Sequence, residues 1–282
     1  MALGSTDTLD QIASLLAAAS CATCYLNKGS VANSLSGQDF SLWRATGDPV
    51  QPAIPGAVAD CDNTTAGGMF VAAGLPNRTA PDVNYLAFAL MNQGANSGQT
   101  QEIHDRLRHY GGLSGTVTTA QTVNLAVTGS SANMVERKGL ANYSEVQWWL
   151  ERYTDTGAAS VNATIAVTYD DASSGNIVLT GIGTTVRAGR MLRILSAVAG
   201  RCIREVVSVT PSATTGTAGN FGVTATRPLV ELPNDVMQRS NKYDWADLPI
   251  TSVPASLCAM AKVVAAGATT GSLRATAKII VA

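Results

Sequence analysis

Strict alternation of side-chain type constrains this chain more than any other feature of its sequence. Between residues 161 and 169, Val, Ala, Ile, Val and Tyr occupy every second position, with Asn, Thr, Ala and Thr between them. Residues 273–281 alternate in the same way, with Arg274, Thr276 and Lys278 between apolar residues. A period of two is typical of a β-strand that buries one face. Both segments are therefore predicted to be strands of a packed sheet.

Other runs also predict strands, and the turns between them suggest how these strands pair. Three hairpins are predicted across Gly-containing turns, joining 84–91 to 101–110, 145–153 to 161–169, and 257–265 to 273–281. Shorter strand-like runs lie at 177–179, 191–195, 202–209 and 221–226. This succession of short strands predicts a mainly β fold, a β-sandwich that is jelly-roll-like.

The first 82 residues show a different pattern. Residues 5–19 place Leu9, Ile12, Leu15 and Leu16 at helical spacing, which predicts a short N-terminal helix. The stretch 25–82 is punctuated by Gly and Pro and sustains no period, which is unusual inside a compact domain. It is either an extended irregular arm lying across neighbouring subunits or a set of ordered surface loops. The predicted organisation is an N-terminal helix and extended arm over 1–82, then a β-sandwich domain over 83–282.

The chain is poor in charge. Charged residues make up 14% of the sequence, against roughly 25% in typical soluble domains. The surface must therefore be dominated by uncharged polar side chains, or part of it must be covered by partners. The net charge is −1 and no basic block occurs, so nucleic-acid binding is not expected. No apolar run reaches the roughly 18 residues that span a bilayer, and no basic residue precedes Lys28, so neither a membrane partner nor a signal peptide is expected.

The five cysteines do not form the pattern of a disulfide scaffold, since their number is odd and their spacing sparse. Cys21 and Cys24 form a single C-x-x-C without a second pair or a nearby His. Two small buried thiols are the simpler interpretation. Cys21 and Cys24 nevertheless remain the candidate disulfide or thiol pair.

Catalytic motifs are not found, so no catalytic residue, cofactor or metal site is predicted. The two histidines, His104 and His109, are five residues apart, which on a regular strand places them on opposite faces. The nearest approach to a carbohydrate site is the group of acidic residues Glu145, Glu151 and Asp155 around Trp148 and Trp149. The interpretation of those tryptophans as core and interface residues is preferred.

Candidate interface residues come from two features. Adjacent Trp148 and Trp149 should face opposite sides of a strand, and an outward tryptophan is a typical interface anchor. Arginine forms planar pairs with carboxylates of a partner. The predicted contact residues, besides segment 25–60, are Trp43, Trp149, Arg187, Arg190, Arg193, Arg201 and Arg204.

Four segments carry a resemblance to a known family: 40–47 (Phe-Ser-Leu-Trp-Arg-Ala-Thr-Gly), 111–124, 153–158 and 216–224. Together with the hairpin that contains Cys258, they resemble a family of virion structural proteins of tailed bacteriophages. The likeness runs from about residue 40 to the C-terminus and consists of turns and strand edges.

The resemblance implies a non-enzymatic virion component, a capsid decoration or cement protein made in the host cytoplasm. Its expected partners are copies of itself, with a trimer as one candidate, and the major capsid protein. Two alternatives stay open. One is a neck, tail-tip or fibre protein, and the other is a carbohydrate-binding spike domain.

Overall fold

The computed structural model describes residues 9–18, 21–32, 34–72, 74–75, 83–94, 98–128, 134–183, 187–244, 247–248 and 252–281. Its helices and strands, in chain order, are α1 (Leu9–Ala17), β1 (Ala22–Lys28), β2 (Asp39–Ser41), β3 (Gly47–Asp48), β4 (Ala59–Asp60), β5 (Asn84–Gln93), β6 (Gln99–Leu113), β7 (Gln121–Ala126), α2 (Met134–Arg137), β8 (Gln147–Thr154), β9 (Ala163–Tyr169), β10 (Ser174–Leu179), β11 (Arg190–Ile194), β12 (Ile203–Pro211), β13 (Asn220–Asn234), β14 (Ser240–Tyr243), β15 (Ser252–Val253), β16 (Ala259–Val264) and β17 (Leu273–Val281).

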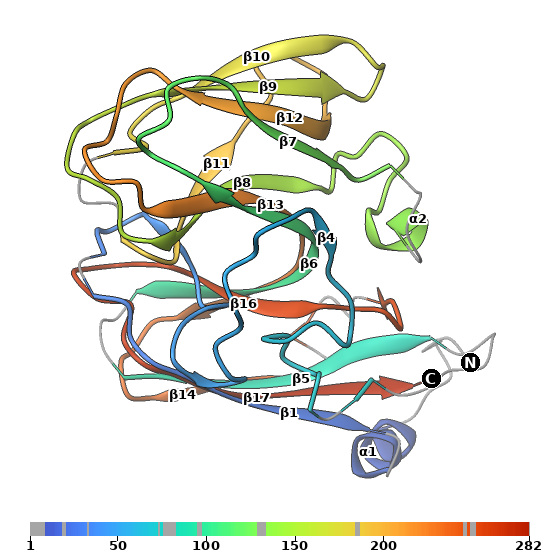
Figure 1. Cartoon of the computed structure of the whole chain (residues 1–282). Helices are drawn as coiled ribbons and strands as arrows, with labels where there is room; N and C mark the ends of the chain where they lie inside the picture. Colours follow the sequence, from blue (N-terminus) through green and yellow to red (C-terminus); the bar gives the residue numbers. More distant parts are fainter. Residues whose placement is uncertain are drawn as a thin grey trace.

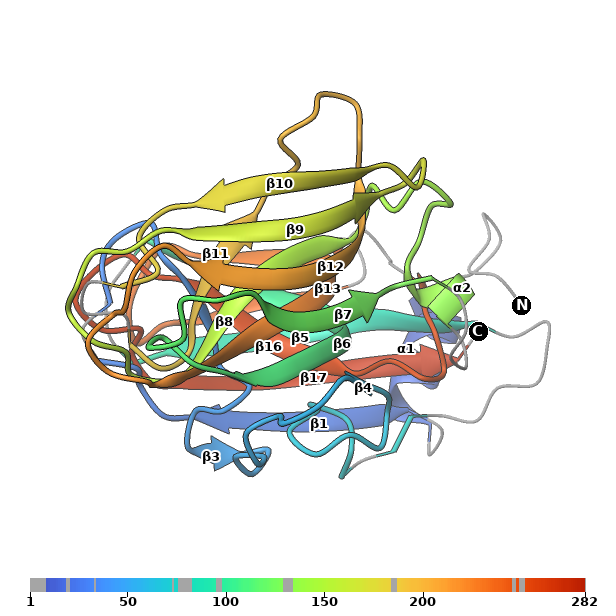
Figure 2. The ribbon, with the colours of Figure 1, turned by 45° about the horizontal axis from the view of Figure 1, so that its top comes forward.

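The strands form three stacked layers (Figure 1). One outer layer, the β5 sheet, has the order β14-β5-β17-β1-β3, with β15 also paired to β5. The other outer layer, the β9 sheet, has the order β10-β9-β12-β7. The middle layer lies between them, as Figure 2 also shows from a second direction. The mainly β architecture with packed sheets and a short N-terminal helix is therefore confirmed, but the sheets form three layers.

The middle layer closes on itself. Its strands follow the order β13-β8-β11-β2-β16-β6, and β6 then pairs with β13, while β4 pairs with the other edge of β6. All these pairs are antiparallel. We call this ring of six strands the central barrel. Its narrowest link is β2, which holds β11 and β16 together through three residues, Asp39–Ser41.

Two apolar cores separate the barrel from the outer sheets, and the long strands β6 and β13 contribute to both. Ile103 of β6 packs in the core towards the β5 sheet, whereas Leu107 packs in the core towards the β9 sheet. In the same way, β13 places Leu232 in the first core and Val223 in the second. Each strand changes the layer that it faces because its register shifts along its length.

The three predicted hairpins are wrong, although the strands themselves are present. β5 belongs to the β5 sheet and β6 to the barrel; β8 belongs to the barrel and β9 to the β9 sheet; β16 belongs to the barrel and β17 to the β5 sheet. At each of these turns the chain crosses from one layer to the next. The alternation of apolar and polar residues shows only which face of a strand is buried. It is the same whether the next strand in the sequence pairs beside this one or belongs to the layer that this strand faces.

The N-terminal region is woven into the same sheets. β1 lies between β17 and β3, and β2 lies between β11 and β16. Segment 25–60 is therefore not a free arm, and strands from both sides of residue 83 share sheets. Helix α1 lies against β17 on the outer side of the β5 sheet, where Lys278 Nζ donates to the Leu16 carbonyl at 3.4 Å. The side chains of Leu9 and Ile12 lie outside the described residues, while those of Leu15 and Leu16 are half-buried.

Candidate functional site

The interior of the central barrel contains charged side chains. Arg106 of β6 and Glu151 of β8 approach to 2.7 Å, and both are about 1% exposed or less. Thr224 of β13 donates to Glu151 at 2.5 Å, and Arg106 donates to the hydroxyl of Tyr153 at 3.2 Å. The Arg106 guanidinium also lies 4.7 Å from the centre of the Trp43 ring. This ion pair is thus enclosed by hydrogen-bonding and aromatic groups.

A second network fills the barrel towards β16. Lys262 Nζ lies 2.7 Å from Glu102 and 2.5 Å from Asp39. His104 Nε2 lies 2.6 Å from the same Glu102 carboxylate. Lys262 is also 4.9 Å from the centre of the Trp149 ring, which comes from β8 on the opposite wall. Contacts between such distant strands of the ring place these side chains inside it.

These surroundings shift the pKa values in the direction that keeps the pairs ionised. Burial raises the pKa of Glu102, but the hydrogen bonds from His104 and Lys262 and the charge of Lys262 outweigh it and hold the pKa at about 2. Burial likewise opposes ionisation of Glu151, and Arg106 with Thr224 lowers its pKa below the ordinary value. Burial lowers the pKa of His104. The carboxylates are held as stable anions, which suits structural ion pairs.

The positions of the charges could have been inferred from the sequence. Glu102, His104 and Arg106 occupy every second position of β6, opposite in phase to Gln101 and Ile103. A strand with a regularly charged face and a buried apolar face can turn its charges either to water or into a second, polar core. The closed barrel imposes the second arrangement.

The predicted tryptophan anchors do not reach the surface. Trp43 is 1% exposed and Trp149 is 3% exposed. Trp148 faces the core towards the β9 sheet and Trp149 faces the barrel interior, so the two do point in opposite directions. Both side chains are nevertheless buried, because the β9 sheet covers this side of the barrel from outside. Trp148 is 2% exposed and Glu151 is 1% exposed, so these residues do not line the open groove that the carbohydrate-binding alternative requires.

The histidines also depart from the prediction, since both contact the barrel tryptophans. The ring of His104 lies 6.4 Å from that of Trp149, and the ring of His109 lies 6.4 Å from that of Trp43. Arg106 and Arg108 pair with consecutive residues of β13, which leaves Leu107 as an extra residue in β6. The extra residue shifts the in-and-out alternation of side chains by one position. His104 and His109 therefore point to the same side of the strand although they are five residues apart. Within the described part of the chain, no group of His, Cys, Asp or Glu has the arrangement of a metal site.

The five predicted arginines do not form one cluster. Arg187 pairs with Asp155 at 2.6 Å, and Arg201 pairs with Asp171 at 2.7 Å, so both are engaged within the chain. Arg193 stacks 4.9 Å from the centre of the Trp149 ring, and burial lowers its pKa to about 10. Arg190 and Arg204 are half-buried, on β11 and β12 respectively. The arginines therefore belong to two different layers.

Cys21 and Cys24 carry free thiols. Cys24 of β1 is buried in the core towards the β5 sheet, where burial raises the pKa of its thiol to about 12. Cys21 precedes β1 and is half-buried.

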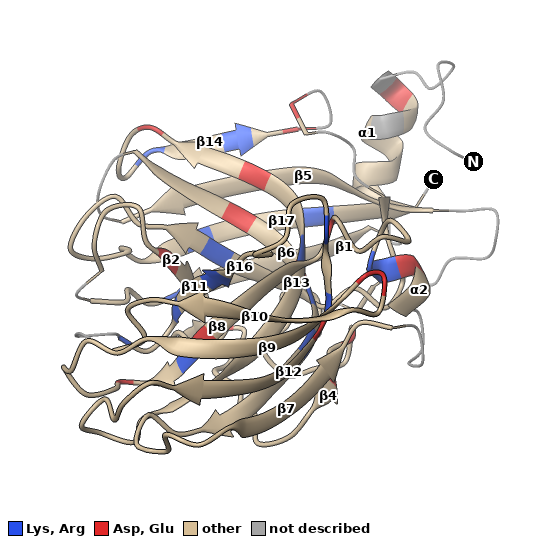
Figure 3. Cartoon of the chain, turned by 90° about the horizontal axis from the view of Figure 1, so that it is seen from above, with Lys and Arg blue, Asp and Glu red and all other residues tan. Residues whose placement is uncertain are grey.

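The outer face of the β9 sheet is the largest feature of the surface that sequence reasoning missed. β7, β9 and β10 contain no charged residue, and Figure 3 shows β9 and β10 without a blue or red segment. β12 contributes Arg204 and Glu205, and Glu205 accepts a hydrogen bond from Thr168 of β9 at 3.2 Å. Cross-strand pairing aligns Val178, Thr164 and Thr210 in one row and Asn176, Ala166 and Ser208 in the next. Val178 is 65% exposed. We call this surface the β9 face.

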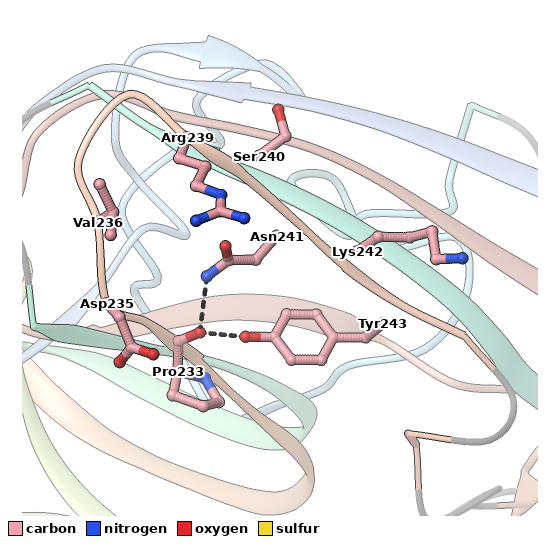
Figure 4. A pocket seen from close by; sticks show the side chains of 8 residues that line it. All are labelled: Pro233, Asp235, Val236, Arg239, Ser240, Asn241, Lys242 and Tyr243. Carbon is pink, nitrogen blue, oxygen red and sulfur yellow. Dashed lines mark hydrogen bonds between the residues drawn. The ribbon is translucent and has the colours of Figure 1, made fainter.

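Concave regions among the described residues are shallow. One lies between the end of β13 and β14, where the Pro233 carbonyl accepts hydrogen bonds from Asn241 at 3.1 Å and from the Tyr243 hydroxyl (Figure 4). Another lies on the β9 face beside Ala166, Asn176 and Val207. The first is lined by Asp235, Arg239, Ser240 and Lys242, with no histidine or cysteine among its described lining residues. Neither described helix is long and apolar enough to cross a membrane.

Comparisons with known proteins give little further information. No family model and no curated protein matched the chain. Among solved structures, that of infectious bursal disease virus Gt strain is 11% identical, covers 93% of this chain and 80% of its own, and has a TM-score of 0.18. The Gx strain structure has 9% identity, coverages of 93% and 79%, and a TM-score of 0.19. The VP2 subviral particle of the same virus has 9% identity, coverages of 92% and 79%, and a TM-score of 0.17. A likeness this weak carries no functional argument.

Proposed function

We propose that this chain is a non-enzymatic structural subunit of a tailed-bacteriophage virion, and specifically a capsid decoration protein. In this role it binds neighbouring copies of itself and the major capsid protein. The observation that carries the proposal is the β9 face, a sheet surface to which three of the four strands contribute no charged residue. The resemblance of segments 40–47, 111–124, 153–158 and 216–224 to tailed-phage virion proteins supports the choice of particle.

The distribution of charge supports a surface that is covered in the assembled particle. The chain has 19 basic and 20 acidic residues. At least eight of them are buried: Lys28, Glu102, Asp105, Arg106, Arg137, Glu151, Arg152 and Lys262. A chain already poor in charge therefore places a substantial share of its charges inside. The cores of protein interfaces are depleted in charged residues in the same way.

The free edge of the β9 sheet supports the same interpretation. Among the described strands, β10 pairs only with β9, so its other edge offers backbone N–H and C=O groups. β10 has neither Pro nor a charged side chain, which are the usual means of protecting an exposed edge from pairing with another chain. An edge of this kind suits a subunit whose neighbour covers it.

A decoration subunit would stabilise the head by mass action, because it binds the assembled lattice and not the dissociated subunits. Each contact can be weak, since many symmetry-related copies act together. The buried ion pairs of the barrel fix the layer on which the β9 sheet packs, which favours the same geometry of the β9 face in every copy.

The test is to add the purified chain to expanded, undecorated tailed-phage capsids and to determine the structure of the particles by electron cryo-microscopy. We expect saturable density that follows the threefold, fivefold or sixfold positions of the lattice, together with a higher temperature of capsid disruption. Density confined to the portal vertex would assign the chain to the neck. Absence of binding at saturating concentration would contradict both positions.

A further inference from the structure

Cys61 and Cys258 lie side by side in the fold although they are far apart in the sequence. Cys61 directly follows β4, and Cys258 directly precedes β16, and both of these strands pair with β6. The Cys61 amide donates to the Leu107 carbonyl at 2.9 Å, and the Arg106 amide donates to the Cys258 carbonyl at 2.8 Å. The two cysteines therefore occupy adjacent positions beside β6, between the end of β4 and the start of β16.

One buried ion pair holds both cysteine backbones. Arg137 of α2 binds Asp105 at 2.5 Å, and each side chain is 1% exposed. Arg137 also donates to the Cys61 carbonyl, and Asp105 accepts a hydrogen bond from the Cys258 amide at 3.0 Å. The two thiols hydrogen-bond to each other, and Cys61 Sγ lies 3.3 Å from His109 Nδ1. Both cysteines are fully buried.

We propose that Cys61 and Cys258 are a site of oxidative modification, at which a peroxide converts the two free thiols into an intrachain disulfide. The Cys61 thiolate attacks one peroxide oxygen, the O–O bond breaks, and Cys61 becomes a sulfenic acid. The Cys258 thiol then gives up its proton, and its sulfur attacks the Cys61 sulfur. The S–S bond forms as hydroxide leaves. In total, two thiols and one hydrogen peroxide give one disulfide and two waters.

The surroundings of the two sulfur atoms suit this order of events. Burial raises the pKa of the Cys61 thiol, but the hydrogen bonds from Cys258 and His109 and the charge of Arg106 outweigh it and hold the pKa well below the ordinary value. Burial and the neighbouring Cys61 raise the pKa of Cys258. Since the thiolate is the reactive form, Cys61 is the attacking residue and Cys258 the resolving one.

The crosslink would tie the segment after β4 to the barrel strand β16 and close a loop of about 200 residues, for which the unfolded chain loses much entropy. We therefore expect oxidation to raise the midpoint of thermal unfolding by about 5 °C or more. A reductant should reverse the change.

The experiment treats the purified full chain with hydrogen peroxide, blocks the remaining thiols, and maps peptides by mass spectrometry without reduction. The expected result is a crosslinked pair of peptides containing Cys61 and Cys258, with Cys24 still free. The matched control is Cys24→Ala, another buried and free cysteine, which should leave both crosslink and stabilisation intact. Cys258→Ala should remove both and leave Cys61 as a sulfenic or sulfinic acid.

Two outcomes would overturn the proposal. One is that both thiols remain free in the wild-type chain after Cys202, which is partly exposed, has been oxidised. The other is a crosslink between different cysteines. Because the wild-type measurement does not depend on any variant, a folding defect in Cys258→Ala would not affect the decision.

Discussion

Arg106 and Glu151 form an ion pair of 2.7 Å although strand β13 separates their strands, β6 and β8, within the sheet. Their side chains meet inside the barrel, over Thr224 of the intervening strand, which hydrogen-bonds to both. The pair therefore connects three strands at once. Its geometry requires the curvature of a closed sheet, since on a flat sheet two side chains separated by a strand lie roughly 10 Å apart.

Removing one member of this pair should be strongly destabilising. Arg106→Met leaves the Glu151 carboxylate buried without its partner, and we expect the free energy of unfolding to fall by about 3–5 kcal/mol. Urea unfolding followed by tryptophan fluorescence measures the change. A loss below about 1 kcal/mol would mean that the pair contributes no more than an exposed one.

Arg152 provides the matched comparison, because it is equally buried but lacks a carboxylate partner among the described residues. Its guanidinium lies 4.5 Å from the centre of the Phe221 ring, and burial, together with Arg190, lowers its pKa to about 9. Two of its nitrogens make no hydrogen bond. Arg152→Met should leave the free energy of unfolding unchanged or raise it, because a buried cation is replaced by an apolar side chain of similar length.

Glu102 should make the chain sensitive to acid. Its pKa is about 2 in the folded chain against an ordinary value of 4.5. The stabilisation is therefore complete above pH 4.5 and is lost as the pH falls towards 2. Glu102→Gln should lower the free energy of unfolding at neutral pH by about 2 kcal/mol, after allowance for partial solvent screening.

The measurement is a series of urea titrations between about pH 6 and about pH 2. The difference between wild type and Glu102→Gln should shrink as the pH falls through this range. The same comparison in a His104→Gln background removes the contribution of His104, whose pKa is lowered by burial and raised by Glu102. A difference that stays constant with pH would show that Glu102 contributes through packing and not through its charge.

Gly222 of β13 lies directly against the backbone of β6. A Cβ atom at this position would lie 1.7 Å from the Tyr110 carbonyl oxygen, which belongs to the backbone and cannot rotate away. Gly222→Ala should therefore force the two strands apart and destabilise the chain by at least about 3 kcal/mol. Gly56, with no atom within 4 Å of its Cβ position, is the control, and Gly56→Ala should be nearly neutral.

The β9 face should tolerate charge in the isolated subunit and not in the particle. Val178→Lys places an ammonium group at an exposed position near the end of β10 and should change the free energy of unfolding by less than about 0.5 kcal/mol. Capsid binding should fall at least about tenfold, because an unpaired charge would be buried in the contact. Val236→Lys, also at an exposed valine but beyond the end of β13, should bind like wild type. Equal binding by both variants would exclude the β9 face from the contact.

The sequence predicted the strands well and their partners poorly. Alternation located β9 and β17, and the apolar runs located β5, β6, β8 and β16. The predicted strand pairing was wrong because a short connection, such as Asp155 to Gly157, has the same sequence character in a hairpin and in a crossing between layers. β2 and β4 are three and two residues long, so no period could identify them.

The buried charges likewise could not be paired from the local sequence pattern alone. Lys262 follows three apolar residues of β16 and meets Glu102 only because β16 and β6 are neighbours in the ring. Trp149 was predicted to face outward because a two-layer sandwich has an outer side. In the observed fold its strand has layers on both sides, and that arrangement depends on the whole chain.

The link formed by β2 has a consequence for the order in which the chain can fold. The ring needs residues 39–41, 190–191 and 262–264 together, so it cannot close on a ribosome until residue 264 has emerged. Until then the nascent chain carries open strand edges and unpaired interior charges, which favours binding by chaperones and slow, post-translational folding. Truncated translation products that lack residues 262–264 should consequently be insoluble, and the rate at which the native subunit accumulates would be set by its folding and not by its synthesis.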